Sequence, residues 1–231
     1  PILFDAGVQG AFFPPVAPVA RSELLDVNRV HFILAVADAI EVGRYIDEYV
    51  VAYSEVYNLR SPNEYRAEWE KPSRLDLASV IYVKRMLQVA LPEVVRNNIA
   101  KDLFSRYVST DESSFARELY VTEEQLRVMQ GSGMYVGAHG DSHYWLNSID
   151  KDQQNREIEG AQEFLRRIGS PVDDYWVMCF PYGAWNDDLL ESLLGYNCTL
   201  GLTTDNRTAR IGEDNPLLLP RLDTNDLPIS F

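Results

Sequence analysis

Basic residues and long apolar runs are scarce in this sequence. The 231 residues include 21 lysines and arginines against 35 aspartates and glutamates, which gives a formal net charge of −14. This balance argues against nucleic acid or an anionic membrane surface as the main partner, because both attract positive charge. No run of 18 apolar residues is present, so the sequence predicts no membrane-spanning helix.

Cysteine is also rare. Cys179 and Cys198 both stand among apolar residues, so we interpret them as buried free thiols, which fits a cytoplasmic protein. The chain begins at Pro1 without a visible signal peptide. We therefore expect a cut or an unseen segment at this end, and a cytoplasmic location is the working expectation.

The scarcity of histidine makes the spacing of two of the three histidines informative. His139 and His143 stand four residues apart and follow an apolar run, 134–136, that we predict to be a buried strand. On a helical turn this spacing would put two neutral imidazoles on one face, where they can share a metal ion. Asp141 and Ser142 would then orient the rings. Alternatively, the two histidines cap a strand end and bond to carbonyl groups.

The remaining histidine and the overall pattern predict the architecture. His31 stands in an expected helix, and we predict a packed side chain with one hydrogen bond. A content of 46% hydrophobic residues suits one α/β domain. Strands alternate with helices, which favours a parallel sheet or barrel. We expect strands at 8–13, 134–136, 175–180, 196–203 and 217–222, and helices at 122–130, 153–168 and 187–194.

Residues 22–119 interrupt this alternation. They read as almost continuous helix, at 26–39, 39–57 with a break near Gly43, 75–91 and 92–107, with a polar surface stretch at 63–71 and a stiff proline loop before them at 14–18. Nearly 100 residues exceed what a crossover between two strands needs. We interpret this block as an inserted helical subdomain that serves as a lid or as a surface for homo-oligomer formation.

Four motifs occur in a characteristic order. They are GAFF at 10–13, TEEQLRVMQGSGMYVGAHGDSH at 122–143, CFPYGAWN at 179–186 and LPRLDTNDLP at 219–228. With them the sequence resembles the NodB-type polysaccharide deacetylases, carbohydrate esterase family 4 in the broad sense. The resemblance implies that residues 1–231 form a distorted (β/α) barrel of about seven parallel strands, an α/β fold with the block 22–119 as a large helical insertion. The insertion is similar to that of relatives associated with bacterial O-antigen and lipopolysaccharide assembly.

The resemblance also implies a metal site. His139 and His143 match the two metal-binding histidines of the family, for which zinc is the first expectation, with cobalt, nickel and iron as alternatives. The third ligand and the catalytic base of the family are adjacent aspartates one helix before the first of these motifs. Asp5 mimics them but stands too close to Phe12. We therefore expect this motif upstream of Pro1, or its absence from the protein.

Two departures from the family pattern concern catalysis. Cys179 stands where many members carry an arginine before the Pro-Tyr pair, and no histidine follows His143, although many members use a late histidine as general acid. We expect Arg221, Asp223 or Asp226 to occupy the region of the late histidine. Alternatively, these residues form only a salt bridge or a turn at the end of a strand.

The reaction implied by the resemblance is hydrolysis of an N-acetyl or O-acetyl group on a sugar. In this interpretation the backbone N–H of Tyr182 holds the oxyanion, with catalytic assignments also for Arg221 and Asp223. An aromatic wall would bind the sugar, formed by Phe180, Tyr182, Trp145 and Trp185. A non-catalytic sugar-binding homologue and a metal-dependent hydrolase of another amide or ester remain as alternatives.

Overall fold

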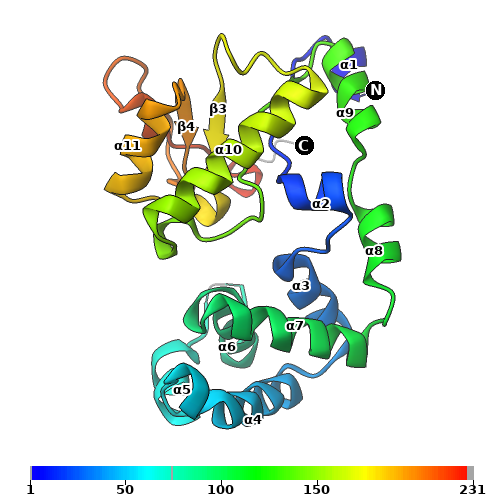
Figure 1. The fold of residues 1–231 in the computed structure, drawn as a ribbon, viewed down its shortest axis with the longest axis vertical. Coiled ribbons are helices and arrows are strands. Elements are labelled where there is room, and N and C mark those ends of the chain that lie inside the picture. The colour runs from blue at the N-terminus through cyan, green and yellow to red at the C-terminus, as the bar shows by residue number, and fades with distance from the viewer. Residues whose placement is uncertain (1, 74, 228–231) are drawn as a thin grey trace. The chain divides into compact units, whose positions relative to one another are not determined.

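The computed structural model describes residues 2–73 and 75–227 (Figure 1). The chain divides into two compact units. One comprises Pro1–Glu23 and Leu119–Phe231 and carries the strands; we call it the sheet unit. The other, Leu24–Glu118, is the helical unit. In the part of the chain that is described, no helix is long and apolar enough to cross a membrane.

The helical unit is a bundle of capped helices. Asp38 caps α4 by accepting hydrogen bonds from the N–H groups of Ile40 and Glu41, and Ser61 and Glu64 form a capping box at the start of α5. Such caps satisfy N–H groups that have no partner within the helix. The elements are α3 Asp26–Val36, α4 Ala39–Tyr57, α5 Pro62–Trp69, α6 Ala78–Arg85, a π-helical turn Met86–Ala90, α7 Glu93–Tyr107 and α8 Glu112–Leu119.

Two sequence predictions for this unit are wrong. The polar stretch 63–71, in contrast, is mostly at the surface as expected, and most of it belongs to α5, which begins at its capping box. The helix expected over 75–91 begins at Ala78 and becomes π-helical at Met86. The break near Gly43 is absent and α4 continues through it. A Cβ atom at Gly43 would lie 3.3 Å from Nη2 of Arg66 and 3.5 Å from the ring of Tyr82, so α4 passes close to both side chains there.

Buried charges link the helices of this unit. Arg29, with 8% of its side chain exposed, pairs with Asp26 at 2.6 Å and with Glu112 at 2.7 Å. A second group joins Asp47 to Arg66 at 2.6 Å and to the hydroxyl of Tyr82 at 2.6 Å. Each guanidinium therefore replaces lost hydration with carboxylate partners.

The strands of the sheet unit are short and parallel. They are β1 Ala11–Phe12, β2 Tyr135–Val136, β3 Val177–Cys179 and β4 Leu200–Leu202. β1 pairs with β2 and β3 pairs with β4, and a parallel bridge between Ala138 and Met178 connects the two pairs. Leu219 adds a further parallel bridge to Leu202. The parallel arrangement is confirmed, whereas the described residues contain four strands rather than the seven expected.

Prolines explain two further corrections in this unit. The strand expected at 217–222 is a 3₁₀ turn, Pro216–Leu218, followed by the single bridge at Leu219. Prolines on both sides of that bridge have no N–H for a longer ladder. The stiff loop expected at 14–18 runs instead into α2, Val16–Arg21. Pro18 is tolerated there because the first turn of a helix has N–H groups without helical partners.

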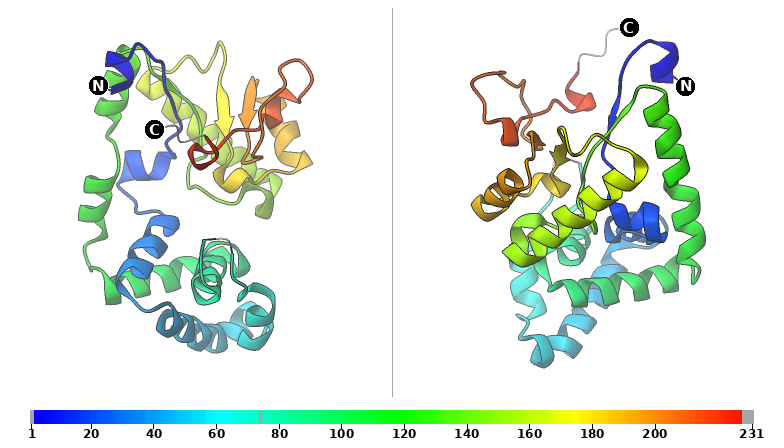
Figure 2. Two further views of the ribbon diagram at one scale, coloured as in Figure 1. Left: turned by 180° about the vertical axis from the view of Figure 1, so that it is seen from behind. Right: turned by 45° about the horizontal axis from the view of Figure 1, so that its top comes forward.

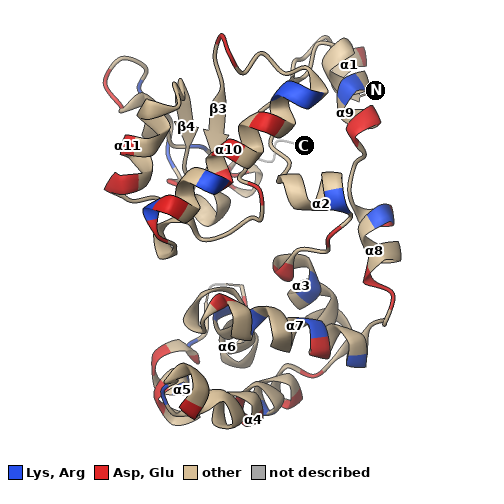
Figure 3. Ribbon diagram, viewed as in Figure 1, with Lys and Arg blue, Asp and Glu red and all other residues tan. Residues whose placement is uncertain are grey.

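Helices cover the sheet and complete its core (Figure 2). Apolar residues of α10, among them Phe164 and Leu165, share one buried cluster with Trp176 and Met178 of the sheet. The elements are α1 Ile2–Asp5, α9 Glu123–Gly131, α10 Lys151–Ile168 and α11 Asp187–Gly195, with 3₁₀ turns at Leu146–Ser148, Pro181–Gly183 and Thr224–Asp226. Charged residues of both signs are spread along α10 (Figure 3), yet Glu157 among them is only 4% exposed.

Candidate functional site

The candidate site lies where two neighbouring parallel segments end. The loop 139–145 follows β2, and the turn Pro181–Gly183 follows β3. Because Ala138 and Met178 pair directly, the two loops leave the same edge of the sheet side by side. Loops at the carboxyl ends of parallel strands are the usual place for active sites in α/β folds.

His139 and His143 converge in this loop. Their ring centroids lie 4.8 Å apart, and Nδ1 of His139 lies 2.6 Å from the carbonyl oxygen of Cys179. Since a carbonyl only accepts, Nδ1 carries the proton and Nε2 keeps its lone pair. Burial lowers the pKa of both imidazoles, and burial together with the neighbouring His139 lowers that of His143 to about 3. Both rings are therefore neutral at pH 7, the form that binds metals.

The pair does not lie on a helical turn, as its spacing predicted. Residues 139–145 form an irregular loop in which Gly140 and His143 adopt left-handed backbone conformations, with φ of 73° and 61°. Glycine takes this conformation without strain, whereas a histidine there is uncommon. The loop must therefore be held in place by contacts outside itself.

Glu157 of α10 supplies the strongest of these contacts. Its Oε2 accepts hydrogen bonds from the N–H groups of Asp141 at 2.7 Å and Ser142 at 2.9 Å. Burial raises the pKa of Glu157, and the two N–H groups oppose that rise. A Cβ atom on Gly140 would come within 2.8 Å of the same oxygen. The loop thus closes around a buried carboxyl group that only a glycine at position 140 admits.

The start of α2 holds the same loop from another side. The N–H groups of Val16 and Ala17 donate to the carbonyl oxygens of Gly140 and Asp141 at 3.2 and 2.9 Å. Arg21, at the end of α2, makes a bidentate pair with Asp141 at 3.1 and 2.7 Å. Ser142 donates to the same carboxylate at 3.0 Å. The hydrogen bonds of Asp141 and Ser142 therefore fix the loop backbone, and not the imidazole rings as the sequence had suggested.

The second loop adds aromatic side chains. Tyr182 has a left-handed backbone, with φ of 58°. Its ring lies 4.8 Å from that of His143 and stacks on Trp145 at 4.6 Å with an interplanar angle of 12°. Within the described part of the chain, the buried indole N–H of Trp145 has no hydrogen-bond partner. Such a donor without a partner is rare in proteins, and its burial keeps it from contact with a ligand.

Two aromatic residues of the expected wall have other surroundings. Phe180 is 1% exposed and belongs to the hydrophobic core, so its ring has no surface to offer a sugar. Trp185 is 38% exposed and lines a separate cavity beside Gly183. The wall next to the histidines is thereby reduced to Trp145 and Tyr182.

The late polar residues lie on exposed turns. Arg221 donates through Nε to the carbonyl of Thr203 at 2.9 Å, and its charge contributes to the low pKa of His139. Asp223 caps a turn by accepting from the N–H of Asn225, while Asp226 accepts from Asn206 at 2.7 Å. Arg221 is thus the late residue whose charge acts on the histidine pair.

His31 lies in the helical unit, on α3, and is exposed, so the prediction of a packed side chain is wrong. The helix buries Val30 and Ile33 instead.

The donor set suits part of a metal site. Two neutral imidazoles with neighbouring rings are appropriate zinc ligands, but a catalytic zinc takes three protein ligands. Among residues 2–73 and 75–227, no third histidine, cysteine, aspartate or glutamate joins the pair. The described residues therefore supply two of the protein ligands that a catalytic metal ion would need.

Glu157 and Arg21 are the site residues that sequence reasoning missed. A signal existed for Glu157, because it occupies the buried face of α10 together with Gln154, Ile158 and Ala161. A charged residue on the apolar face of a helix needs a partner. The position of that partner in the chain was not readable from the sequence.

Comparison with known proteins agrees with the motifs. Residues 96–200, which include both loops of the site, match the family model described as polysaccharide deacetylase. Comparison with curated protein sequences gives no match.

Solved deacetylases are among the similar structures. The Streptococcus pyogenes deacetylase PplD in complex with acetate is 16% identical, with 93% of this chain and 91% of that chain covered and a TM-score of 0.42. IcaB from Ammonifex degensii is 13% identical, with 93% and 90% covered and a TM-score of 0.38. A de-N-acetylase from Aggregatibacter actinomycetemcomitans is 18% identical, with 46% and 49% covered and a TM-score of 0.37.

Proposed function

We propose that this protein removes acetyl groups, most of all N-acetyl groups, from a sugar of a bacterial surface polysaccharide or of its precursor. The proposal is supported by the match of residues 96–200 to the family model described as polysaccharide deacetylase. The observation that carries the proposal is the pair of neutral imidazoles with ring centroids 4.8 Å apart. This pair lies inside the matched region, at the carboxyl ends of parallel strands.

We assign a divalent metal, zinc first, to His139 and His143. The carbonyl of Cys179 supports this assignment, since it fixes the tautomer of His139 that leaves Nε2 available. When bound, such a metal lowers the pKa of a water molecule and polarises the acetyl carbonyl. The resemblance assigns the third ligand and the base to adjacent aspartates, and among the described residues no carboxylate joins the two histidines.

The residues of this chain hold and orient the substrate in the proposal. The left-handed Tyr182 directs its backbone N–H toward the oxygen of the acetyl group, where negative charge develops. The stacked rings of Tyr182 and Trp145 form an apolar wall against which the sugar packs. In the net reaction the amide C–N bond breaks, water oxygen bonds to the acetyl carbon, and acetate and a free amine leave.

A cytoplasmic place of action belongs to the same proposal. Both cysteines are free and buried, as is usual in a reducing compartment. Self-association through the helical unit remains a prediction.

A specific observation also favours the second candidate, a sugar-binding homologue without catalysis. The described residues provide two metal ligands and no third, and no histidine follows His143. Such a protein would keep the aromatic wall and the loops but would release no acetate.

Acetate release separates the two candidates. Full-length protein is incubated with N-acetylated hexosamine oligosaccharides, before and after chelation and re-addition of zinc, cobalt or nickel. We expect metal-dependent release that falls at least 100-fold in the His139→Ala, His143→Ala double variant. The matched control is His31→Ala, which removes an exposed histidine of the other unit. Absence of release with every metal, together with retained oligosaccharide binding, would establish the sugar-binding homologue instead.

A further inference from the structure

The two loops of the candidate site meet through ring contacts. The first loop carries His143 and the second carries Tyr182, and the centroids of these two rings lie 4.8 Å apart. In the proposed reaction the histidine pair and the backbone N–H of Tyr182 serve the same acetyl carbonyl. Groups that act together must keep their separation, since a misplacement of about 1 Å can cost roughly 100-fold in rate. The contacts that set the distance between the loops therefore matter for turnover.

Gln154 of α10 connects the ends of both loops. The residue is buried, with 0% of its surface exposed. Its Nε2 donates to the carbonyl oxygen of Leu146 at 2.8 Å and to Oδ1 of Asn186 at 3.0 Å. Leu146 directly follows the first loop, and Asn186 ends the second. One buried nitrogen thus joins the two loops where they leave the site.

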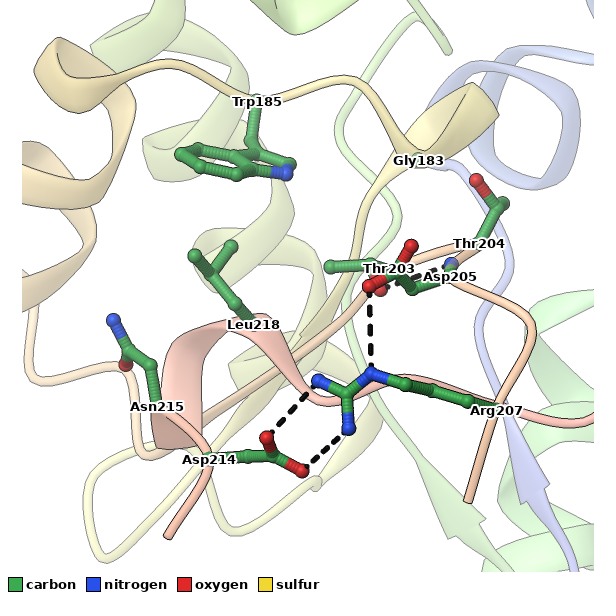
Figure 4. A pocket seen from close by; sticks show the side chains of 9 residues that line it. All are labelled: Gly183, Trp185, Thr203, Thr204, Asp205, Arg207, Asp214, Asn215 and Leu218. Carbon is green, nitrogen blue, oxygen red and sulfur yellow. Dashed lines mark hydrogen bonds and ion pairs between the residues drawn. The ribbon is translucent and has the colours of Figure 1, made fainter. Parts of the chain in front are cut away.

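Asn186 extends this connection to α11. The second loop runs from Gly183 past Trp185 (Figure 4) to Asn186, which is the N-cap of the helix. Its Oδ1 accepts from the N–H of Leu189 at 3.0 Å. Because the same oxygen accepts from Gln154, the start of α11 and the end of the first loop belong to one hydrogen-bond network.

A glutamine suits this position because two acceptor oxygens face one nitrogen. A primary amide carries two donor hydrogens and no charge, whereas a carboxylate would repel both oxygens and a buried ammonium group would lose its hydration. The Oε1 of Gln154 has no hydrogen-bond partner among the residues that the structure describes. An unsatisfied buried acceptor costs stability. A choice of residue that stability does not favour is typical of functional sites.

The two candidate metal ligands are held by other contacts. Glu157 fixes the backbone between the two histidines, and the carbonyl of Cys179 fixes the ring of His139. The bonds of Gln154 reach the first loop only after its last residue. Loss of the Gln154 amide would therefore shift the loops relative to each other and leave the histidine pair in place.

We infer that Gln154 is a positioning residue for the reaction. It sets the separation of the histidine loop and the loop of Tyr182, and so places the backbone N–H of Tyr182 relative to the imidazoles. The inference rests on the proposed function, because turnover is the property that this separation controls. Glu157 would then determine metal binding, and Gln154 would determine the rate of the loaded enzyme.

Turnover and metal affinity are measured on full-length Gln154→Met, which keeps an unbranched side chain and removes both donors. Gln154→Leu is the second variant should the first fail to fold. The matched control is Gln162→Met, because Gln162 is another buried glutamine of α10 and its Nε2 donates to the carbonyl of Tyr196 at 3.1 Å, outside both loops. We expect kcat for acetate release to fall about 10- to 100-fold in Gln154→Met, with the metal affinity of wild type. The control should keep the kcat of wild type.

The indole N–H resonance of Trp145 gives a readout that does not need turnover. Trp145 stacks on Tyr182 across the two loops, so a change in their separation changes the ring current at the indole. The resonance is assigned in ¹⁵N-labelled protein by comparison with Trp145→Phe. We expect it to move in Gln154→Met and to stay in place in Gln162→Met.

Several results would overturn the positioning role. They are a wild-type kcat in folded Gln154→Met, an equal loss of kcat in Gln162→Met, and a loss of metal affinity as large as the loss of kcat. If wild type releases acetate and Gln154→Met releases it equally fast, the deacetylase stands and the positioning role fails. If wild type releases no acetate, the deacetylase fails, and an unmoved Trp145 resonance in Gln154→Met would then exclude the role of Gln154 as well.

Discussion

The two units of this molecule use buried charge differently. In the helical unit, arginines pair with carboxylates of other helices, as the buried Arg29 does with Glu112 and the half-buried Arg66 with Asp47. In the sheet unit, the buried carboxyl group of Glu157 accepts from two backbone N–H groups of one loop. The first arrangement fixes helices against each other. The second fixes a loop conformation, and the two candidate metal ligands are in that loop.

This difference predicts which substitutions reduce stability alone and which also reduce metal binding. Breaking a charge pair in the helical unit should cost folding free energy. Breaking the contact at Glu157 should in addition cost metal affinity, because the positions of His139 and His143 depend on it. The following variants test this distinction, from the largest expected effect to the smallest.

Replacement of Glu157 should have the largest effect. Glu157→Ala leaves two buried N–H groups without an acceptor, so we expect a loss of about 2 to 3 kcal/mol in unfolding free energy and roughly 10- to 100-fold weaker metal binding. Glu157→Gln retains an acceptor and should recover most of the affinity. Urea unfolding and metal titration measure the two effects. Glu163→Ala, an exposed carboxylate on the same helix, is the control, and equal metal affinity in all three variants would contradict the assignment.

Replacement of Arg29 tests the charge pairs of the helical unit. Arg29→Ala leaves Asp26 and Glu112 partly buried without their cation, and a broken buried pair costs about 3 kcal/mol. Urea unfolding should show this loss. Metal affinity at low temperature should equal that of wild type, because Arg29 belongs to the helical unit. A parallel loss of metal affinity in the folded protein would show that the units do not divide stability and function in this way.

Two glycines sharpen the comparison within the sheet unit. Gly140→Ala should cost about 1 to 2 kcal/mol for the left-handed backbone, and further free energy for the contact of 2.8 Å with Glu157. Gly169→Ala meets the same backbone strain at the end of α10, but no atom lies within 4 Å of its Cβ position. We therefore expect the larger loss at Gly140, measured by thermal unfolding. Equal losses would mean that the loop adapts freely around Glu157.

The smallest effect concerns the ion pair of Arg207, whose side chain is 44% exposed, with Asp214, whose side chain is 9% exposed. The hydrogen bonds from Arg207 lower the pKa of Asp214 to about 2. Because the folded-state pKa is depressed, the stabilisation is complete above the unfolded value near ~3.9 and is lost as the pH falls toward about 2. Carboxyl carbon NMR should give this midpoint, and Arg207→Ala should return it to the ordinary range. An unchanged midpoint in the variant would exclude the pair as the cause.

Local chemistry made part of this structure predictable. The expected helices at 122–130 and 153–168 are present, with a capping box of Thr122 and Gln125 at the start of α9, an N-cap at Asp150 and a left-handed Gly169 at the end of α10. Each depends on residues a few positions apart, so sequence spacing determines them. The presence of His139, His143 and Tyr182 in one site followed from the family resemblance, and the parallel strand pattern agrees with it.

The other features of the site depend on contacts between residues far apart in the chain, which sequence spacing does not reveal. The partners of Glu157 stand 15 and 16 residues away, and Arg21 stands 120 residues from Asp141. The short strands also escaped exact prediction, because apolar runs such as 175–180 extend beyond the residues that pair in β3. Tertiary contacts decided these features, and sequence periodicity did not.

Metal content is the measurement that tests the central claim most directly. Full-length protein and its His139→Ala, His143→Ala variant are titrated with zinc, cobalt and nickel, and bound metal is measured by mass spectrometry after gel filtration. The account predicts one divalent ion per chain in wild type and none in the double variant, with both proteins folded. No stoichiometric metal in either folded protein would contradict it.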